Sequence, residues 1–157
     1  MPRLYIVAVG EKLPDWANKA CDEYLRRLPR GFECLLFEIR AEPRTSGKTV
    51  DRMMAAEAQR LRAALPRGAR LVGLDEHGKD LTTLQFSARL RQWLDSGSPT
   101  AFLIGGPDGL DPELKSACEM LVRLSSFTLP HALARTVFSE QLYRAASVLS
   151  GHPYHRD

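Results

Sequence analysis

The sequence has few cysteines and no long apolar run, and both absences narrow the kinds of protein that it encodes. Its first apolar stretch, Leu4 to Val9, is far shorter than the ~20 residues of a membrane helix, and Glu11 and Lys12 follow at once. We therefore expect a cytoplasmic protein with no membrane segment. The 3 cysteines are odd in number and far apart, which predicts reduced thiols and neither a disulfide framework nor a zinc site.

The sequence also lacks a strong charge imbalance and the usual glycine motifs of nucleotide-binding proteins. Lys and Arg number 22 against 19 Asp and Glu, and a net charge of +3 permits a nucleic-acid partner without requiring one. No GxGxxG motif is present. Ser46 to Thr49 is similar to the end of a P-loop, but Glu42 stands where the first glycine is required, and a carboxylate there would repel phosphate. This disfavours a nucleotide-triphosphate enzyme, and residues 40–49 are either a basic loop that meets an anionic partner or a plain solvated connection.

The length of 157 residues and the 44% hydrophobic content indicate a single domain, residues 1–157, with one sizeable core. Strand-like and helix-like patterns alternate along the chain, which predicts an α/β fold on a mainly parallel sheet flanked by helices. The expected strands are residues 3–9, 32–39, 70–75, 101–104 and 120–125. The expected helices are residues 14–28, 50–65, 82–94, 111–118 and 133–150.

A glycine-rich stretch, Phe102 to Leu110, follows the fourth expected strand. Its adjacent glycines leave bare backbone on which a flat ligand can lie, although a tight turn that needs positive φ explains them equally well. Leu74 with Asp75, and residues 125–129, also lie at the carboxyl ends of expected strands. Because such ends meet at one edge of a parallel sheet, we expect the three segments to converge on one ligand.

Seven motifs, in order along almost the whole chain, resemble the RlmH family of ribosomal RNA large-subunit methyltransferases. They are AVGxKxPDW from residue 8, EYLRRxP from 23, LDxxG from 74, LIGGPxGL from 103, LSxxTLPH from 124, ExLYRA from 140 and HPYHR from 152. The resemblance implies a SPOUT-type α/β knot, whose carboxyl-terminal part forms a trefoil knot, acting as a homodimer. It also implies methylation of N3 of a pseudouridine in 23S rRNA, within the large subunit or the assembled ribosome.

The same resemblance implies S-adenosyl-L-methionine as the methyl donor, S-adenosyl-L-homocysteine as its product, and no metal. Apolar walls with backbone donors and acceptors suit the flat, edge-polar adenine ring of this cofactor. The cofactor-binding positions carried over from the family are Leu74, Gly105, Leu124, Ser125, Ser126, Phe127, Thr128 and Leu129.

The last residues carry the groups that methyl transfer to an imide nitrogen needs. His155 can accept a proton, Arg156 can stabilise a developing oxyanion, and Tyr154 can stack on a base or donate a hydrogen bond. Taken alone, such a tail is more often a frayed terminus. The resemblance favours the hypothesis that these three catalytic residues complete the RNA-facing site against the partner subunit's cofactor.

Three further residues on or near the last expected helix have more than one possible role. Arg135 and Arg144 either face phosphates or belong to a solvated helix face, on which Arg144 pairs with Glu140. We expect His131 to be a structural cap of this helix. A non-catalytic RNA-binding or ribosome-binding factor stays open as an alternative function, although such a factor needs no cofactor pocket.

Overall fold

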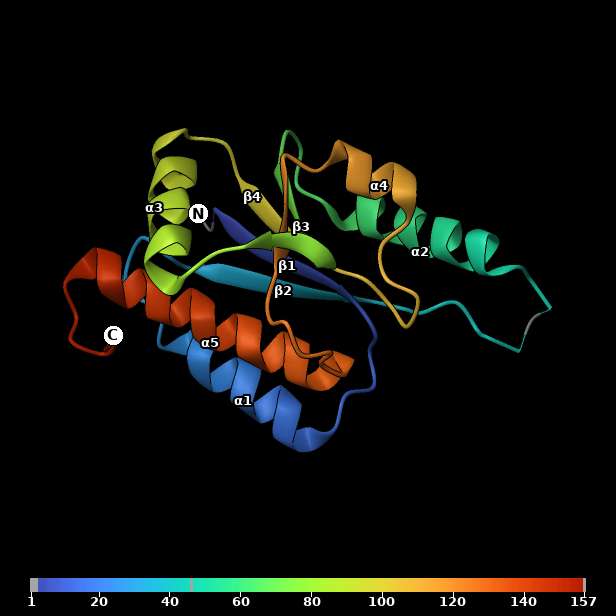
Figure 1. Cartoon of the computed structure of the whole chain (residues 1–157), viewed down its shortest axis with the longest axis horizontal. Helices are drawn as coiled ribbons and strands as arrows, with labels where there is room; N and C mark the ends of the chain where they lie inside the picture. Colours follow the sequence, from blue (N-terminus) through green and yellow to red (C-terminus); the bar gives the residue numbers. More distant parts are fainter. Residues whose placement is uncertain (1–2, 46, 157) are drawn as a thin grey trace.

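The computed structural model describes residues 3–45 and 47–156, which form a five-stranded parallel sheet with helices on both faces (Figure 1). The strand order is β2-β1-β4-β3-β5. The strands are β1 (Leu4–Val9), β2 (Cys34–Ile39), β3 (Arg70–Asp80), β4 (Thr100–Ile104) and β5 (Met120–Arg123). The helices are α1 (Asp15–Arg26), α2 (Val50–Ala64), α3 (Thr83–Asp95), α4 (Pro112–Ala117) and α5 (His131–Ser150). The parallel α/β sheet is confirmed, and the trefoil knot stays a prediction.

Local sequence signals fix where several helices begin. The Thr82 hydroxyl accepts a hydrogen bond from the Gln85 backbone N–H, and the Gln85 side-chain oxygen accepts one from the Thr82 N–H, which together form a capping box. Asp111 caps α4 in front of Pro112, as the sequence predicts. None of the helices in the described part of the chain is long and apolar enough to cross a membrane.

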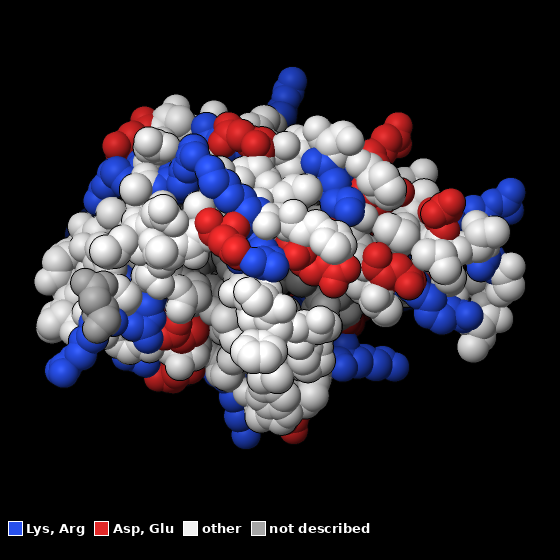
Figure 2. All heavy atoms as spheres, in the orientation of Figure 1, with Lys and Arg blue, Asp and Glu red and all other residues white. Residues whose placement is uncertain are grey.

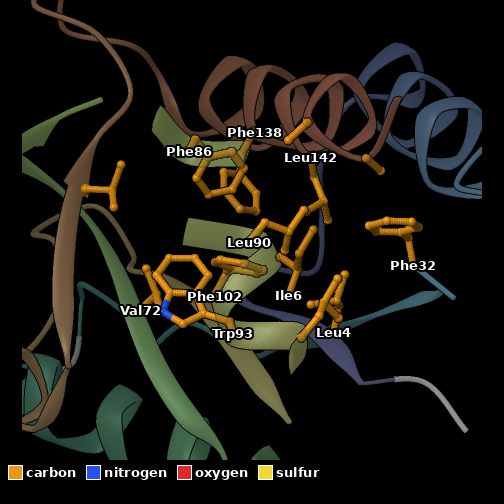
Figure 3. Packing of buried hydrophobic residues seen from close by; sticks show 14 of the residues in the cluster. Leu4, Ile6, Phe32, Val72, Phe86, Leu90, Trp93, Phe102, Phe138 and Leu142 are labelled. Atoms are coloured by element: carbon orange, nitrogen blue, oxygen red, sulfur yellow. The ribbon is translucent and has the colours of Figure 1, made fainter. Parts of the chain in front are cut away.

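The sheet separates two apolar cores. On one face, α1, α3 and α5 cover a cluster that centres on Phe102 of β4 (Figure 3). The Phe102 ring lies 4.9 Å from that of Phe138 on α5 and 5.9 Å from that of Trp93 on α3, measured between centroids. Helices α2 and α4 cover the second cluster on the opposite face. Because β4 is buried on both faces, its carboxyl end at Ile104 has a fixed position.

The expected end of the third strand at Asp75 is wrong, because β3 continues to Asp80. Its pairing with β5 shifts between Leu74 and Lys79, so the residues between them bulge away from the ladder. Gly78 allows the strand to return, since a Cβ at this position would lie 2.7 Å from the backbone carbon of Val122. Leu74 therefore stands at the start of a bulge and not at the end of a strand.

The Gly78→Ala substitution tests whether this close backbone approach holds β3 against β5. The added methyl meets backbone, which cannot rotate away, so we expect a loss of about 1–3 kcal/mol in the free energy of unfolding. Urea denaturation measures the loss. Lys79→Ala, next to it on an exposed position, is the control and changes stability little. Equal midpoints for Gly78→Ala and the unsubstituted protein would contradict this account.

Candidate functional site

A cleft of about 600 Å³ opens at the carboxyl edge of the sheet, beyond β3, β4 and β5. Three segments form most of its lining: the bulge from Leu74, the glycine loop at residues 105–109 and the segment from Leu124 to the first turns of α5. Lys115 of α4 also lines it. The strand register brings them together, because Leu74 pairs with Ile104 on one side and with Val122 on the other. The convergence of the three segments is confirmed, and the shared ligand stays a prediction.

The glycine loop forms a tight turn that closes one wall of the cleft. The Gly109 N–H donates to the Gly106 carbonyl at 2.9 Å, and Gly109 has a φ of +85°. A Cβ at Gly105 would lie 2.5 Å from the carbonyl carbon of Gly109, so the turn closes only with glycine at this position. The sequence left two interpretations of this stretch open, a positive-φ turn and a ligand loop. The structure agrees with both, since the stretch is such a turn and its bare backbone faces a cleft of ligand size.

The predicted cofactor positions gather at this cleft with one exception. The resemblance predicts eight cofactor positions. Of these, only Ser126 lies outside the cleft lining, and it is exposed on the same loop as Ser125 and Phe127. The Phe127 N–H donates to the Ser125 hydroxyl at 2.9 Å, which tightens this loop. The Phe127 side chain is 84% exposed at the cleft. The members that do line the cleft are Leu74, Gly105, Leu124, Ser125, Phe127, Thr128 and Leu129.

Two polar residues of the cleft carry no role in the sequence-based site. The Lys115 ammonium lies 3.4 Å from the Asp75 carboxylate, whose second oxygen accepts from the His77 N–H at 3.0 Å. The exposed fraction of the Asp75 side chain is only 10%, so its charge is held at the cleft by these two donors. Lys115 lies on a different element, and no local pattern links it to Asp75.

His131 lines the cleft in the first turn of α5 and does not cap it, so the expected capping role is wrong. The preceding residue, Pro130, occupies the N-cap position. The His131 Nε2 atom lies 3.0 Å from Nη2 of Arg135, which can only donate, so we assign the ring proton to Nδ1. Burial and, next, the Arg135 charge lower the pKa of His131, which keeps the ring neutral near pH 7.

Arg135 is fully buried, so both alternatives, facing phosphates and lying on a solvated helix face, are wrong for this side chain. Its guanidinium donates to the Gly10 carbonyl at 2.9 Å and pairs with Glu38 of β2. The arginine thereby joins the start of α5 to the ends of β1 and β2. The expected pair of Arg144 with Glu140 is confirmed, at 2.7 Å.

In residues 40–49, which include the segment similar to a P-loop, charged side chains form ion pairs within the protein. Glu42 is buried, and its carboxylate accepts from Lys48, the residue that a P-loop would use for phosphate, and from Arg60. These two cations, Lys48 foremost, hold the pKa of Glu42 below its usual range. This pairing agrees with the sequence-based argument against a nucleotide-triphosphate site.

The three proposed catalytic residues follow the end of α5, and the tail folds back along the second half of this helix. The Tyr154 hydroxyl donates to Glu140 at 2.8 Å, and Nδ1 of His155 lies 3.2 Å from Nη1 of Arg144. Arg156 is exposed. The cleft reaches His131 and Ala134 in the first turns of α5, whereas the tail is held at Glu140 and Arg144. The helix rises by about 14 Å between His131 and Glu140, so the tail does not line the cleft of its own chain. The structure thus brings the cofactor positions together, and it places the tail elsewhere.

An open parallel sheet with a ligand-sized cleft beyond its strand ends is the architecture of α/β enzymes that bind a nucleotide-like cofactor. The chain belongs to the SPOUT methyltransferase family, since the family described as "Predicted SPOUT methyltransferase" matches residues 3–155. Among the described residues, no group of three His, Cys, Asp or Glu side chains is placed to hold a metal ion.

Curated relatives cover nearly the whole chain. "Ribosomal RNA large subunit methyltransferase H" of Bordetella avium (strain 197N) is 55% identical over 154 residues, which are 98% of this chain and 99% of the relative. The protein of the same name from Methylibium petroleiphilum (strain ATCC BAA-1232 / LMG 22953 / PM1) is 55% identical over 155 residues, 99% of each chain.

Solved structures share the fold at low sequence identity. A probable methyltransferase from Bordetella pertussis Tohama I aligns with a TM-score of 0.60 at 16% identity, over 92% of this chain and 95% of that one. A probable methylase family protein from Haemophilus influenzae Rd KW20 aligns with a TM-score of 0.56 at 12% identity, over 99% of this chain and 71% of that one.

The neutral state of His131 predicts a pH dependence of stability. The unfolded chain protonates this histidine at its ordinary pKa of 6.5, whereas the folded chain resists protonation, so stability falls as the pH drops below about 6.5. His131→Gln removes this contribution. We expect its melting temperature to fall less between pH 7.5 and 5.5 than that of the unsubstituted protein, by roughly 2–4 °C, or ~1 kcal/mol in a chain of this length.

Carboxylates that titrate in the same range act equally on both proteins and cancel in this comparison. His77→Gln is the matched control, because the His77 side chain is 83% exposed and its substitution leaves the acid-induced loss in place. The same loss in His131→Gln as in the unsubstituted protein would show that the ring takes up its proton freely.

Proposed function

We propose that this protein methylates N3 of a pseudouridine in the 23S rRNA of the large ribosomal subunit. The observation that carries the proposal is the cleft, at which seven of the eight family cofactor positions converge beyond three parallel strands. The full-length relatives named as large-subunit rRNA methyltransferases support the same reaction. The substrate is then the large subunit or the assembled ribosome, and the protein acts in the cytoplasm.

The cleft suits S-adenosyl-L-methionine as the methyl donor. Its volume of about 600 Å³ falls within the range of small-molecule sites, ~300–1,000 Å³. Leu74, Leu124 and Leu129 offer apolar walls for a flat adenine ring, and the bare backbone of Gly105 and Gly106 offers polar edges without side chains. When bound, this cofactor supplies an electrophilic methyl group and leaves as S-adenosyl-L-homocysteine.

The tail supplies the groups that act on the acceptor base. The N3 proton must leave before the nitrogen can accept a methyl group, and His155 is the residue of the tail suited to take it. Arg156 stabilises the negative charge that then develops on the ring oxygens. Burial and, next, the Glu140 carboxylate raise the pKa of Tyr154 to about 12, so its phenol stays protonated and serves as a donor or stacking surface.

The separation of tail and cleft favours a homodimer in which each tail completes the site of the other chain. Helices α1 and α5 run side by side in the same direction (Figure 1). Apolar residues near the starts of these two helices and on the cleft loop are exposed. The exposed fraction is 52% for Trp16, 41% for Leu133 and 84% for Phe127. Figure 2 shows a surface with few charges over the start of α5. A second copy that covers this surface would bring its tail to the cleft.

A complementation experiment tests the shared site. One variant ends at Pro153 and so lacks the reactive tail, but it keeps the His152 N–H bond to the Ser147 carbonyl that ends α5. The second carries Gly105→Val, whose side chain collides with the turn at Gly109. Each alone should show less than about 1% of normal methylation of ribosomal subunits, since catalytic groups are commonly worth 10²–10⁴-fold.

Mixing the two variants after mild unfolding and refolding should restore activity, because a mixed dimer holds one intact cleft facing one intact tail. Up to about a quarter of the normal activity is expected from random pairing of two variants, in which half the dimers carry one working site of two. Gel filtration checks that each variant dimerises. Absence of restored activity in dimeric mixtures would contradict the shared site.

Two measurements test the reaction itself. Calorimetry should show binding of S-adenosyl-L-methionine and no binding of ATP, and the reverse would favour a nucleotide enzyme. Mass spectrometry of 23S rRNA from a strain without the gene should show one pseudouridine that lacks one methyl group, restored by the gene. An unchanged rRNA alongside intact ribosome binding would favour a non-catalytic binding factor.

A further inference from the structure

An ion-pair network links the basic loop, residues 40–49, to the glycine loop at the cleft. Arg44 stands at its centre: one terminal nitrogen lies 3.0 Å from the Glu57 carboxylate of α2, and the other lies 3.0 Å from the Asp108 carboxylate. Asp108 belongs to the turn Gly106–Gly109. A single guanidinium thus bridges three segments that are far apart in the sequence.

Glu57 supports the same turn from below. Its side chain is 3% exposed, and a Cβ at Gly106 would lie 3.0 Å from Oε1 of Glu57, so the glycine backbone rests directly on the carboxylate. The second oxygen, Oε2, accepts from the Glu42 N–H at 3.0 Å as well as from Arg44. A buried carboxylate needs such partners, since an unpaired one is strongly destabilising.

The planar fork of arginine fits this arrangement better than a lysine would. Its two terminal nitrogens reach two carboxylates at once, and Nη1 also donates to the Glu42 carbonyl at 2.7 Å. The negative charges of Glu57 and, next, Asp108 raise the pKa of Arg44, so its charge is permanent at any physiological pH. The contact with Asp108 joins this fork to the cleft wall.

We infer that Arg44 is a positioning residue that holds the glycine loop in the conformation that binds the methyl donor. The inference rests on the proposed function for the identity of that ligand. Arg44 does not line the cleft, so it acts through Asp108 and Glu57 and not by direct contact. Its removal should therefore weaken donor binding while leaving the rate of methylation at saturating donor within about twofold of normal.

Calorimetric titration with S-adenosyl-L-methionine measures the predicted weakening of donor binding. Arg44→Ala should raise the dissociation constant about tenfold, the effect of losing one hydrogen bond to a charged group, and Arg44→Lys should recover part of it. Asp108→Asn leaves the pair of Arg44 with the buried Glu57 intact, so it tests the link to the turn without endangering the fold. If the two positions act through one contact, the Arg44→Ala/Asp108→Asn double variant binds about as weakly as Arg44→Ala alone.

Lys48→Ala is the matched control, because Lys48 lies on the same loop but pairs with the Glu42 side chain and not with Glu57 or Asp108. It should lower the melting temperature without changing the dissociation constant. Equal weakening by Lys48→Ala would overturn the inference, because it would show a general effect of disturbing the loop. A dissociation constant for Arg44→Ala within twofold of normal would overturn it too.

Hydrogen exchange of the Gly109 amide, followed by NMR on ligand-free protein, tests the inference without the cofactor. This amide is bonded within the turn, so Arg44→Ala and Asp108→Asn should both accelerate its exchange by about tenfold or more, and Lys48→Ala should not. Unchanged exchange in Arg44→Ala overturns the positioning role. Failure of the unsubstituted protein to bind S-adenosyl-L-methionine would instead overturn the proposed function.

Discussion

At the carboxyl edge of the sheet, backbone packs directly against backbone, and the chain permits this only where it carries glycine. Gly78 lets β3 return to β5 after the bulge that carries Asp75 to the cleft, and Gly105 lets the turn ending at Gly109 close over the end of β4. A parallel sheet alone brings loops to a common edge. Because glycine has no side chain, these loops form continuous walls of backbone with polar edges, which a flat ligand can approach closely.

Ion pairs hold the loops that form the cleft walls in place. A wall of bare backbone has no side chains to anchor it, and here the carboxylate of Glu57 fills the space beneath Gly106 while Arg44 fastens Asp108. On the other side of the sheet edge, Arg135 is fully buried and joins α5 to the strand ends through Gly10 and Glu38. Both arginines use the geometry of the guanidinium to tie separate segments together, a task that a single ammonium performs less well.

The elements that repeat a pattern could be predicted from the sequence, whereas the contacts between distant segments could not. Alternating strand and helix patterns with cap residues such as Thr82 and Asp111 placed the helices and most strand ends correctly. The continuation of β3 to Asp80 was missed because its bulge interrupts the strand pattern, and the pattern resumes for too few residues. The role of Arg44 could not be predicted from the sequence, because its partners Glu57 and Asp108 lie 13 and 64 residues further along the chain.

The packing of the tail bears on the proposal that it acts on a second chain. In one protomer its polar groups are already engaged, since Tyr154 donates to Glu140 and Arg144 stacks 4.7 Å above the Tyr154 ring. A tail packed in this way has lost much of its conformational freedom, so presenting it to another chain's cleft adds little ordering cost. The tail is held at Glu140 and Arg144, away from the first turns of α5 that line the cleft, and this arrangement supports the proposal that methyl donor and acceptor groups meet across a dimer. If that proposal holds, α5 makes catalysis depend on assembly, because it keeps the tail away from the cleft of its own chain.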